Sequence, residues 1–148
     1  ERREKVTIQV NPYLMFNGNC AEALKCYEQA LRAKIEAIMP FAGSPASDTV
    51  PADWADKVLH ASMLVGETRV MASDAPPGHY AAPQGISVSL SLQDPTKGEQ
   101  IFNALSENGQ VQMPYQPTFW AAGFGMCVDR FGIPWMINVE AAGAHGSA

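Results

Sequence analysis

Hydrophobic and polar residues alternate along several short segments of the chain, as they do in β-strands. The clearest case is 86–92, where isoleucine, valine and two leucines alternate with three serines. A period of two predicts a strand with one buried face. Content of β-branched and aromatic residues, together with bounding turn signals, predicts further strands at 6–16, 34–41, 58–65, 68–73, 111–115, 124–128 and 135–139.

Two segments have apolar residues at helical spacing instead. The first follows Asn19, which forms a capping-box pattern with Glu22, and the second follows Thr96, which forms one with Glu99. Each pattern predicts a helix start. The apolar residues that would face the core are Leu24, Tyr27, Leu31, Ile101, Phe102 and Leu105.

The two halves of the chain follow the same order of strand, turn, capped helix, strand, loop and hairpin. This order predicts a single α+β domain over 6–140, made of tandem βαβββ modules at about 6–78 and 84–140. The Pro- and Gly-containing segment 74–85 would connect them. Residues 141–148 are small and polar, and we predict a disordered tail there.

Composition narrows the classes of function. The 148 residues are 47% hydrophobic and carry a formal charge of −5, so a core can form but a nucleic-acid-binding surface is not expected. No apolar run reaches the roughly 20 residues that span a membrane. Three cysteines without regular spacing do not form a disulfide framework. We therefore expect a cytoplasmic protein that binds neither nucleic acid nor membrane.

Four stretches carry a resemblance to a known family: NPYLMFNGNC at 11–20, HA at 60–61 with MASD at 71–74, FW at 119–120 with GFG at 123–125, and DRFGIPWMIN at 129–138. Together they resemble the PhnB-like (3-demethylubiquinone-9 3-methyltransferase-like) branch of the vicinal oxygen chelate superfamily, which also contains glyoxalase I, bleomycin-resistance proteins and extradiol dioxygenases. The resemblance implies that the modules pair their sheets into an incomplete barrel around a cavity. It also implies a homodimer.

Metal-dependent members of that superfamily hold a divalent ion through His, Gln or Glu on the first and last strands of each module. The corresponding positions here fall near residues 11–12, 73–74, 86–87 and 136, where only Asp74 is a plausible ligand. A catalytic divalent ion needs about three protein ligands. His60, His79 and His145 do not complete the set, so we predict no bound metal and no cofactor. The sequence also lacks a glycine-rich strand-to-helix turn for S-adenosylmethionine.

The remaining candidates favour ligand binding. Asp74 is the best candidate for a general base, although Asp is also common in turns such as the one that follows it. The serines of 86–92 form one polar row, which would line a wet cavity or face solvent. Aromatic residues that could wall an apolar pocket, or pack in an ordinary core, are Tyr13, Phe119, Trp120, Phe124 and Trp135.

We therefore expect metal-free binding or sequestration of a small molecule in an aromatic cavity. Two alternatives are a metal-dependent lyase or dioxygenase, and a non-catalytic dimer whose aromatic residues form the subunit interface. The predicted ligand-binding residues are Tyr13, His60, Asp74, Ser87, Ser89, Phe119, Trp120 and Phe124.

Overall fold

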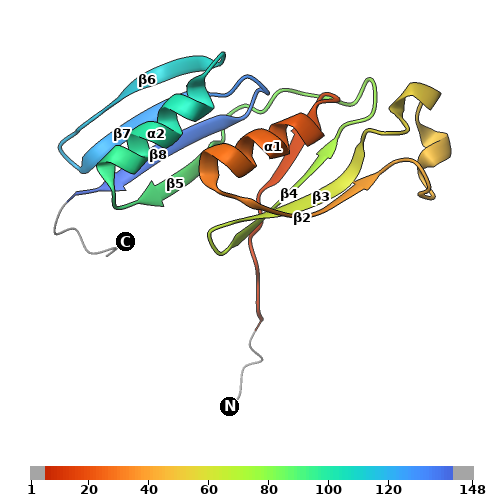
Figure 1. The fold of residues 1–148 in the computed structure, drawn as a ribbon, viewed down its shortest axis with the longest axis horizontal. Coiled ribbons are helices and arrows are strands. Elements are labelled where there is room, and N and C mark those ends of the chain that lie inside the picture. The colour runs from red at the N-terminus through yellow and green to blue at the C-terminus, as the bar shows by residue number, and fades with distance from the viewer. Residues whose placement is uncertain (1–5, 142–148) are drawn as a thin grey trace.

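The computed structural model describes residues 6–141, which form two four-stranded sheets with one helix packed on each (Figure 1). The first half contains β1 (Tyr13–Phe16), α1 (Cys20–Leu31), β2 (Lys34–Pro40), β3 (Val58–Val65) and β4 (Thr68–Asp74). The second half contains β5 (Val88–Leu92), α2 (Pro95–Ser106), β6 (Gln110–Gln116), β7 (Ala121–Val128) and β8 (Pro134–Glu140). Short 3-10 turns at Ser47–Thr49 and Ala52–Trp54 lie in the loop between β2 and β3.

Strand pairing confirms the tandem βαβββ prediction. The sheets have the orders β1-β4-β3-β2 and β5-β8-β7-β6, and in each the first strand runs parallel to the last while the other pairs are antiparallel. Both sheets are open. Within residues 6–141 no strand pairing joins one sheet to the other, so β1 and β5 each keep one free edge.

The first predicted strand is much shorter than the pattern indicated. Only Tyr13–Phe16 pairs with β4, from Tyr13↔Met71 to Phe16↔Asp74. The preceding residues 6–12 are outside any strand, although their apolar and polar residues alternate. Val6, Ile8 and Val10 are 78%, 76% and 83% exposed. The strand predicted at 6–16 was therefore wrong over 6–12, because within residues 6–141 this segment has no strand to pair with.

Both capping-box predictions were wrong. The Asn19 side chain makes no capping bond, and the N–H of Cys20 donates instead to Oδ1 of Asp74 at 2.9 Å. The second helix begins two residues earlier than predicted, with Asp94 as N-cap and Pro95 in the first turn. Asp94 accepts hydrogen bonds from the N–H groups of residues 96 and 97. A carboxylate therefore satisfies the start of each helix.

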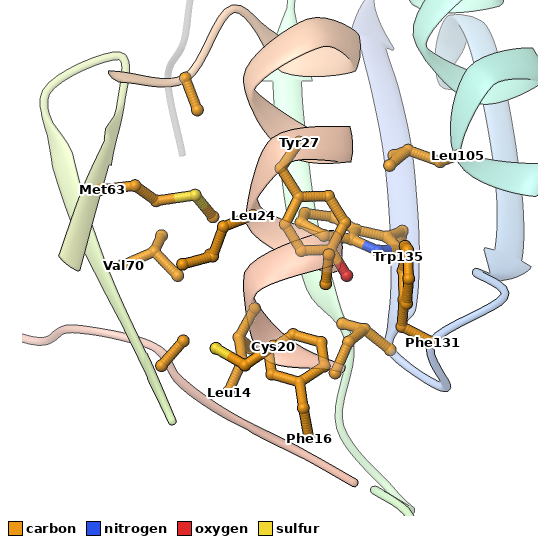
Figure 2. Close-up of a cluster of buried hydrophobic side chains, with 14 of the residues drawn as sticks. Leu14, Phe16, Cys20, Leu24, Tyr27, Met63, Val70, Leu105, Phe131 and Trp135 are labelled. Carbon is orange, nitrogen blue, oxygen red and sulfur yellow. The ribbon is translucent and has the colours of Figure 1, made fainter. Parts of the chain in front are cut away.

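The core lies where α1 meets the second half of the chain (Figure 2). Tyr27 is fully buried and packs its ring against Trp135 of β8, with centroids 5.2 Å apart. Its hydroxyl donates to Oδ2 of Asp129, in the turn between β7 and β8. Because these partners are 102 residues apart in sequence, the modules share one core rather than having one each.

No helix in the described part of the chain is long and apolar enough to cross a membrane. Cys20 and Cys127 are buried, Cys26 is partly buried, and all three are free thiols. Apart from residue 141, the predicted disordered tail lies outside the described residues, as does His145.

Candidate ligand-binding face

Each sheet has one face that its helix does not cover, called here the open face. Directly paired residues on neighbouring strands point to the same side of a sheet, so the pairing register defines these faces. In the first sheet, Tyr13 pairs with Met71 and Met71 with Ser62, which gives one row. A second row contains the Met15↔Ser73 and Met39↔His60 pairs.

The second sheet repeats this arrangement. Ser89, Met136, Met126 and Met113 form one row across all four strands. The next row consists of Ser91, Asn138, Phe124 and Gln116. In Figure 1 both helices lie on the near side of the molecule, so the two open faces form its far side.

Methionine is concentrated on the open faces. The chain has seven methionines, and every one except Met63, which is in the core, belongs to the rows just described. Met15, Met39 and Met113 are 42%, 48% and 40% exposed. Methionine is flexible and polarisable and makes favourable contacts with aromatic rings. The open faces therefore combine adaptable methionine side chains with serine, histidine and amide side chains.

Tyr13 and His60 form a polar contact on the open face of the first sheet. The Tyr13 hydroxyl lies 3.2 Å from Nδ1 of His60, and their ring centroids are 5.7 Å apart. Both were predicted as ligand-binding residues, and the structure brings them together although 47 residues separate them. The contact provides a donor and an acceptor beside the methionines.

Three further predicted residues form an aromatic ladder at the other sheet. The rings of Phe119 and Trp120 have centroids 4.8 Å apart, and those of Trp120 and Phe124 are 5.4 Å apart. Exposure falls along the ladder from 96% to 48% to 8%. Thr118 holds the turn, because its hydroxyl accepts the N–H of residue 121 at 3.1 Å. The ladder therefore leads from solvent to the open face.

A cavity of about 820 Å³, called here the seam cavity, lies between the free edges of β1 and β5. Most of its lining is apolar and comes from both modules, including Leu14, Val70, Leu90 and Ile133. The polar part of the lining consists of the serine row together with Thr68 and Tyr13. The predicted ligand residues Tyr13, Ser87 and Ser89 also line this cavity.

Asp74 lies elsewhere. It is 2% exposed, and its two oxygens accept the N–H groups of Cys20 and Val58, each at 2.9 Å. These bonds fasten the start of α1 and the start of β3 to the end of β4. The role that the geometry supports is structural, because a general base needs an oxygen that can reach substrate.

Comparison with known proteins identifies the family to which this chain belongs. A family model described as 3-demethylubiquinone-9 3-methyltransferase matches residues 8–138. The chain belongs to this family. It is 36% identical to Protein YjdN of Escherichia coli strain K12 over 138 residues, which are 88% of this chain and 94% of YjdN.

Solved structures of the same fold agree. Protein PA1353 from Pseudomonas aeruginosa has 51% sequence identity and a TM-score of 0.82, covering 90% of this chain and 98% of that one. A putative 3-demethylubiquinone-9 3-methyltransferase, PhnB protein, from Bacillus cereus has 18% identity and a TM-score of 0.73, covering 89% and 99%. The PhnB-like resemblance and the two-module fold predicted from the sequence are confirmed.

The donor atoms at the predicted metal positions do not suit a divalent ion. Pro12, Ser73, Ser87 and Met136 offer no carboxylate or imidazole, and Asp74 is already fully engaged. Within residues 6–141, no three His, Cys, Asp or Glu side chains cluster closely enough to hold an ion. The expectation of metal-free binding stays a prediction.

The sequence grouped Trp135 with aromatic residues that could wall a pocket or pack in the core, and in the structure it does both, because it belongs to the core and also lines the seam cavity. It is 1% exposed, and its Nε1 donates to Asp129 at 2.8 Å. Along β8, residues 135, 137 and 139 are all buried while their neighbours are not, and this alternation could have shown which face Trp135 occupies. Asp129 was recognised only as a turn residue, yet it is the buried acceptor that joins the modules.

Burial affects the titration of this core. Burial chiefly, with the nearby Asp74 carboxylate, raises the pKa of Cys20 to about 12. Burial and Asp129 likewise raise the pKa of Cys127 to about 11. The pKa of Tyr27 is raised well above its usual range, first by burial and then by the adjacent Asp129. These groups stay protonated and do not supply a nucleophile at neutral pH.

Proposed function

We propose that this PhnB-like protein binds and sequesters a flat aromatic small molecule on its methionine-rich open faces, without a resident metal. The observation that carries the proposal is the placement of six of the seven methionines on these faces, next to the Tyr13–His60 pair and the aromatic ladder. A core would hide such side chains, whereas here three of the six are 40–48% exposed.

The chemistry of the face suits an aromatic ligand. Thioether sulfur contacts ring edges favourably, by about 0.3–1.5 kcal/mol per contact. Phe124 and Trp120 can stack on a ring face. The hydroxyl of Tyr13, the imidazole of His60 and the amide of Asn138 would then fix the ligand's polar groups, as a few placed polar groups do in apolar pockets.

We also propose that two copies associate in the cytoplasm to enclose the ligand. Support comes from the exposed Met15, Met39 and Met113 on the open faces, since exposed apolar side chains that lie together are typical of binding or association surfaces. The three free thiols are consistent with a reducing compartment. We do not propose the methyltransferase activity in the family's description, because the sequence has no glycine-rich strand-to-helix turn for S-adenosylmethionine.

The test is a thermal-shift screen of chelator-treated protein against planar aromatic compounds, neutral and cationic, with hits measured by calorimetry. Met136→Gln or Met126→Gln should weaken binding about two- to tenfold per lost sulfur–ring contact. Ile38→Gln is the matched control, because Ile38 pairs with the buried Ala61 and so lies on the helix side. If the Met variants bind as wild type does, the open face is not the site.

A second pair of variants examines the polar contact. His60→Gln should alter affinity for ligands with a polar group, whereas His79→Gln should not, because His79 is exposed in the connection between modules. Metal analysis of untagged protein accompanies the screen. One tightly held equivalent of zinc, nickel, manganese or iron per chain would contradict metal-free binding and favour a lyase or dioxygenase.

Trp120→Ala distinguishes ligand binding from a purely structural dimer. Trp120 is 48% exposed in the aromatic ladder, so its removal should reduce ligand affinity and leave the protein folded. Loss of the dimer with unchanged ligand affinity would instead place the ladder in a subunit interface. On the same preparation, sedimentation measures dimer formation and calorimetry measures ligand affinity.

A further inference from the structure

The segment before β1, residues 6–12 and called here the arm, has the composition of a strand but no strand to pair with. Its apolar residues Val6, Ile8 and Val10 alternate with the polar residues Thr7 and Gln9. All five side chains are exposed, and Figure 1 shows the arm leaving the body of the molecule. Exposed β-branched residues with a period of two are typical of a strand that completes another sheet.

The root of the arm is fixed. The N–H of Met71 donates to the carbonyl of Pro12, and Nδ2 of Asn11 donates to the carbonyl of Arg69, each at 2.9 Å. Proline also restricts the residue before it to extended backbone. Asn11 therefore cannot make a tight helical turn, and the arm continues away from β1 instead of folding back along it. Within residues 6–141, no segment covers residues 6–10.

The seam cavity offers a strand edge of matching pattern. β5 pairs with β8 on one side and borders the cavity on the other. Its backbone N–H and C=O groups on the cavity side are free for another strand. Val88, Leu90 and Leu92 are partly buried toward the helix side, whereas Ser89 and Ser91 are exposed on the open face.

We propose that the arm of one copy inserts into the seam cavity of a second copy as an extra strand beside β5, and that the exchange is reciprocal. The arm's apolar row would lie beside the apolar row of β5, and Thr7 and Gln9 beside Ser89 and Ser91. The five free residues 6–10 span about 16 Å when extended, which matches the five residues of β5. The symmetry is that of an isologous dimer.

This inference deepens the proposed dimer and rests on it for the second copy. It adds that each ligand face is completed by residues of the partner, because Thr7 and Gln9 reach the serine row only in the assembled dimer. The alternation of apolar and polar residues in the arm and in β5 disfavours any other pairing register. A shift by one residue would place valine and isoleucine side chains on the polar row.

The test is disulfide trapping between two differently sized chains in a Cys26→Ser background. One chain carries Gln9→Cys and the other carries Ser89→Cys or Ser91→Cys, so a mixed band on a non-reducing gel must join arm to β5 between molecules. The control partner carries Gln112→Cys on β6, the outer edge of the same sheet. We expect the mixed band with β5 and not with β6. Trapping on β6, or no trapping in a protein that sedimentation shows to be dimeric, overturns the inference.

A second variant avoids cysteine chemistry. Ile8→Asp places a charge in the apolar row and should raise the dimer dissociation constant about 10- to 100-fold, the equivalent of one lost apolar side chain. Ile38→Asp, also an exposed isoleucine, should leave dimerisation unchanged. If the Ile8→Asp and Ile38→Asp variants have the same dimer dissociation constant, the arm is not at the interface. Calorimetry with the aromatic ligand reports separately on the open face, so failure of the arm and failure of ligand binding are distinguishable.

Discussion

Removing the Tyr27 hydroxyl should weaken the whole domain. The change Tyr27→Phe keeps the ring and its packing against Trp135 and Phe131, whose centroids lie 5.2 and 6.1 Å away. Only the hydrogen bond from the hydroxyl to Asp129 is lost. The perturbation therefore isolates one polar contact between the first module and the second.

The expected loss of stability depends on the hydrogen bonds that Asp129 still accepts in the Tyr27→Phe variant. Oδ1 still accepts the N–H groups of Phe131 and Ile133 at 2.9 Å each, and Oδ2 still accepts Nε1 of Trp135 at 2.8 Å. A hydrogen bond to a charged group contributes about 1.5–3 kcal/mol. With three of four donors retained, we expect a loss of about 2 kcal/mol, or about 4–8 °C in Tm for a domain of this size.

Urea denaturation followed by circular dichroism and tryptophan fluorescence measures this loss. Tyr115→Phe is the matched control, because the Tyr115 hydroxyl donates at 2.7 Å to the neutral carbonyl of Pro95, and both residues belong to the second module. It should cost about 1 kcal/mol or less. Asp129→Ala, which leaves four buried donors unpaired, should cost more than either.

Two results would refute the reasoning. If Tyr27→Phe costs no more than Tyr115→Phe, the contact between modules does not contribute as argued. If Trp54 in the first module and Trp135 in the second report separate transitions in the wild-type protein, the modules do not share one cooperative core.

Three other predictions concern single positions. Gly98→Ala should destabilise by about 1–3 kcal/mol despite alanine's better helix propensity, because the added Cβ would lie 2.6 Å from Cγ2 of Val139. Asp94→Ala should cost about 1 kcal/mol through the lost cap, measured by thermal melts. Stability should fall as pH rises above about 9. The thiols of the unfolded chain ionise there, whereas in the folded protein the pKa values of Cys20 and Cys127 are raised to about 12 and 11. Chemical denaturation from pH 7 to 11 checks this.

Controls for these predictions are present in the same elements. Asn103→Ala at an exposed position of α2 should be neutral or slightly stabilising, and Asp56→Ala, an exposed aspartate outside a helix cap, should be close to neutral. Cys26→Ala should leave the loss of stability at high pH unchanged, whereas Cys20→Ala should reduce it. A steeper loss in Cys20→Ala than in wild type would contradict the assigned cause.

Local pattern predicted the order of strands and helices, because hydrophobic period is a local property. The cap of α2 also had a local signal, the Asp94-Pro95 pair, which the capping-box interpretation overlooked. The cap of α1 had none, since Asp74 reaches Cys20 across 54 residues. A side chain that satisfies a distant backbone group cannot be found from nearby sequence.

The sequence predicted which residues belong to the candidate site more successfully than it predicted how they are arranged in space. The sequence indicated Tyr13, His60 and the aromatic residues 119, 120 and 124, and the structure brings them into two groups. It gave no indication that the methionines share the open faces, because they lie on six different strands. Their common orientation depends on register, including the bulges in β2 and β6.

The contact between Tyr27 and Asp129 also sets an order of events during synthesis. α1 emerges early, yet the acceptor for its buried hydroxyl and the indole that packs on its ring are both in the last hairpin of the chain. A nascent first module therefore cannot finish its core until translation is nearly complete. The repeat that looks like two interchangeable halves is, for folding, one unit that closes from its C-terminal end.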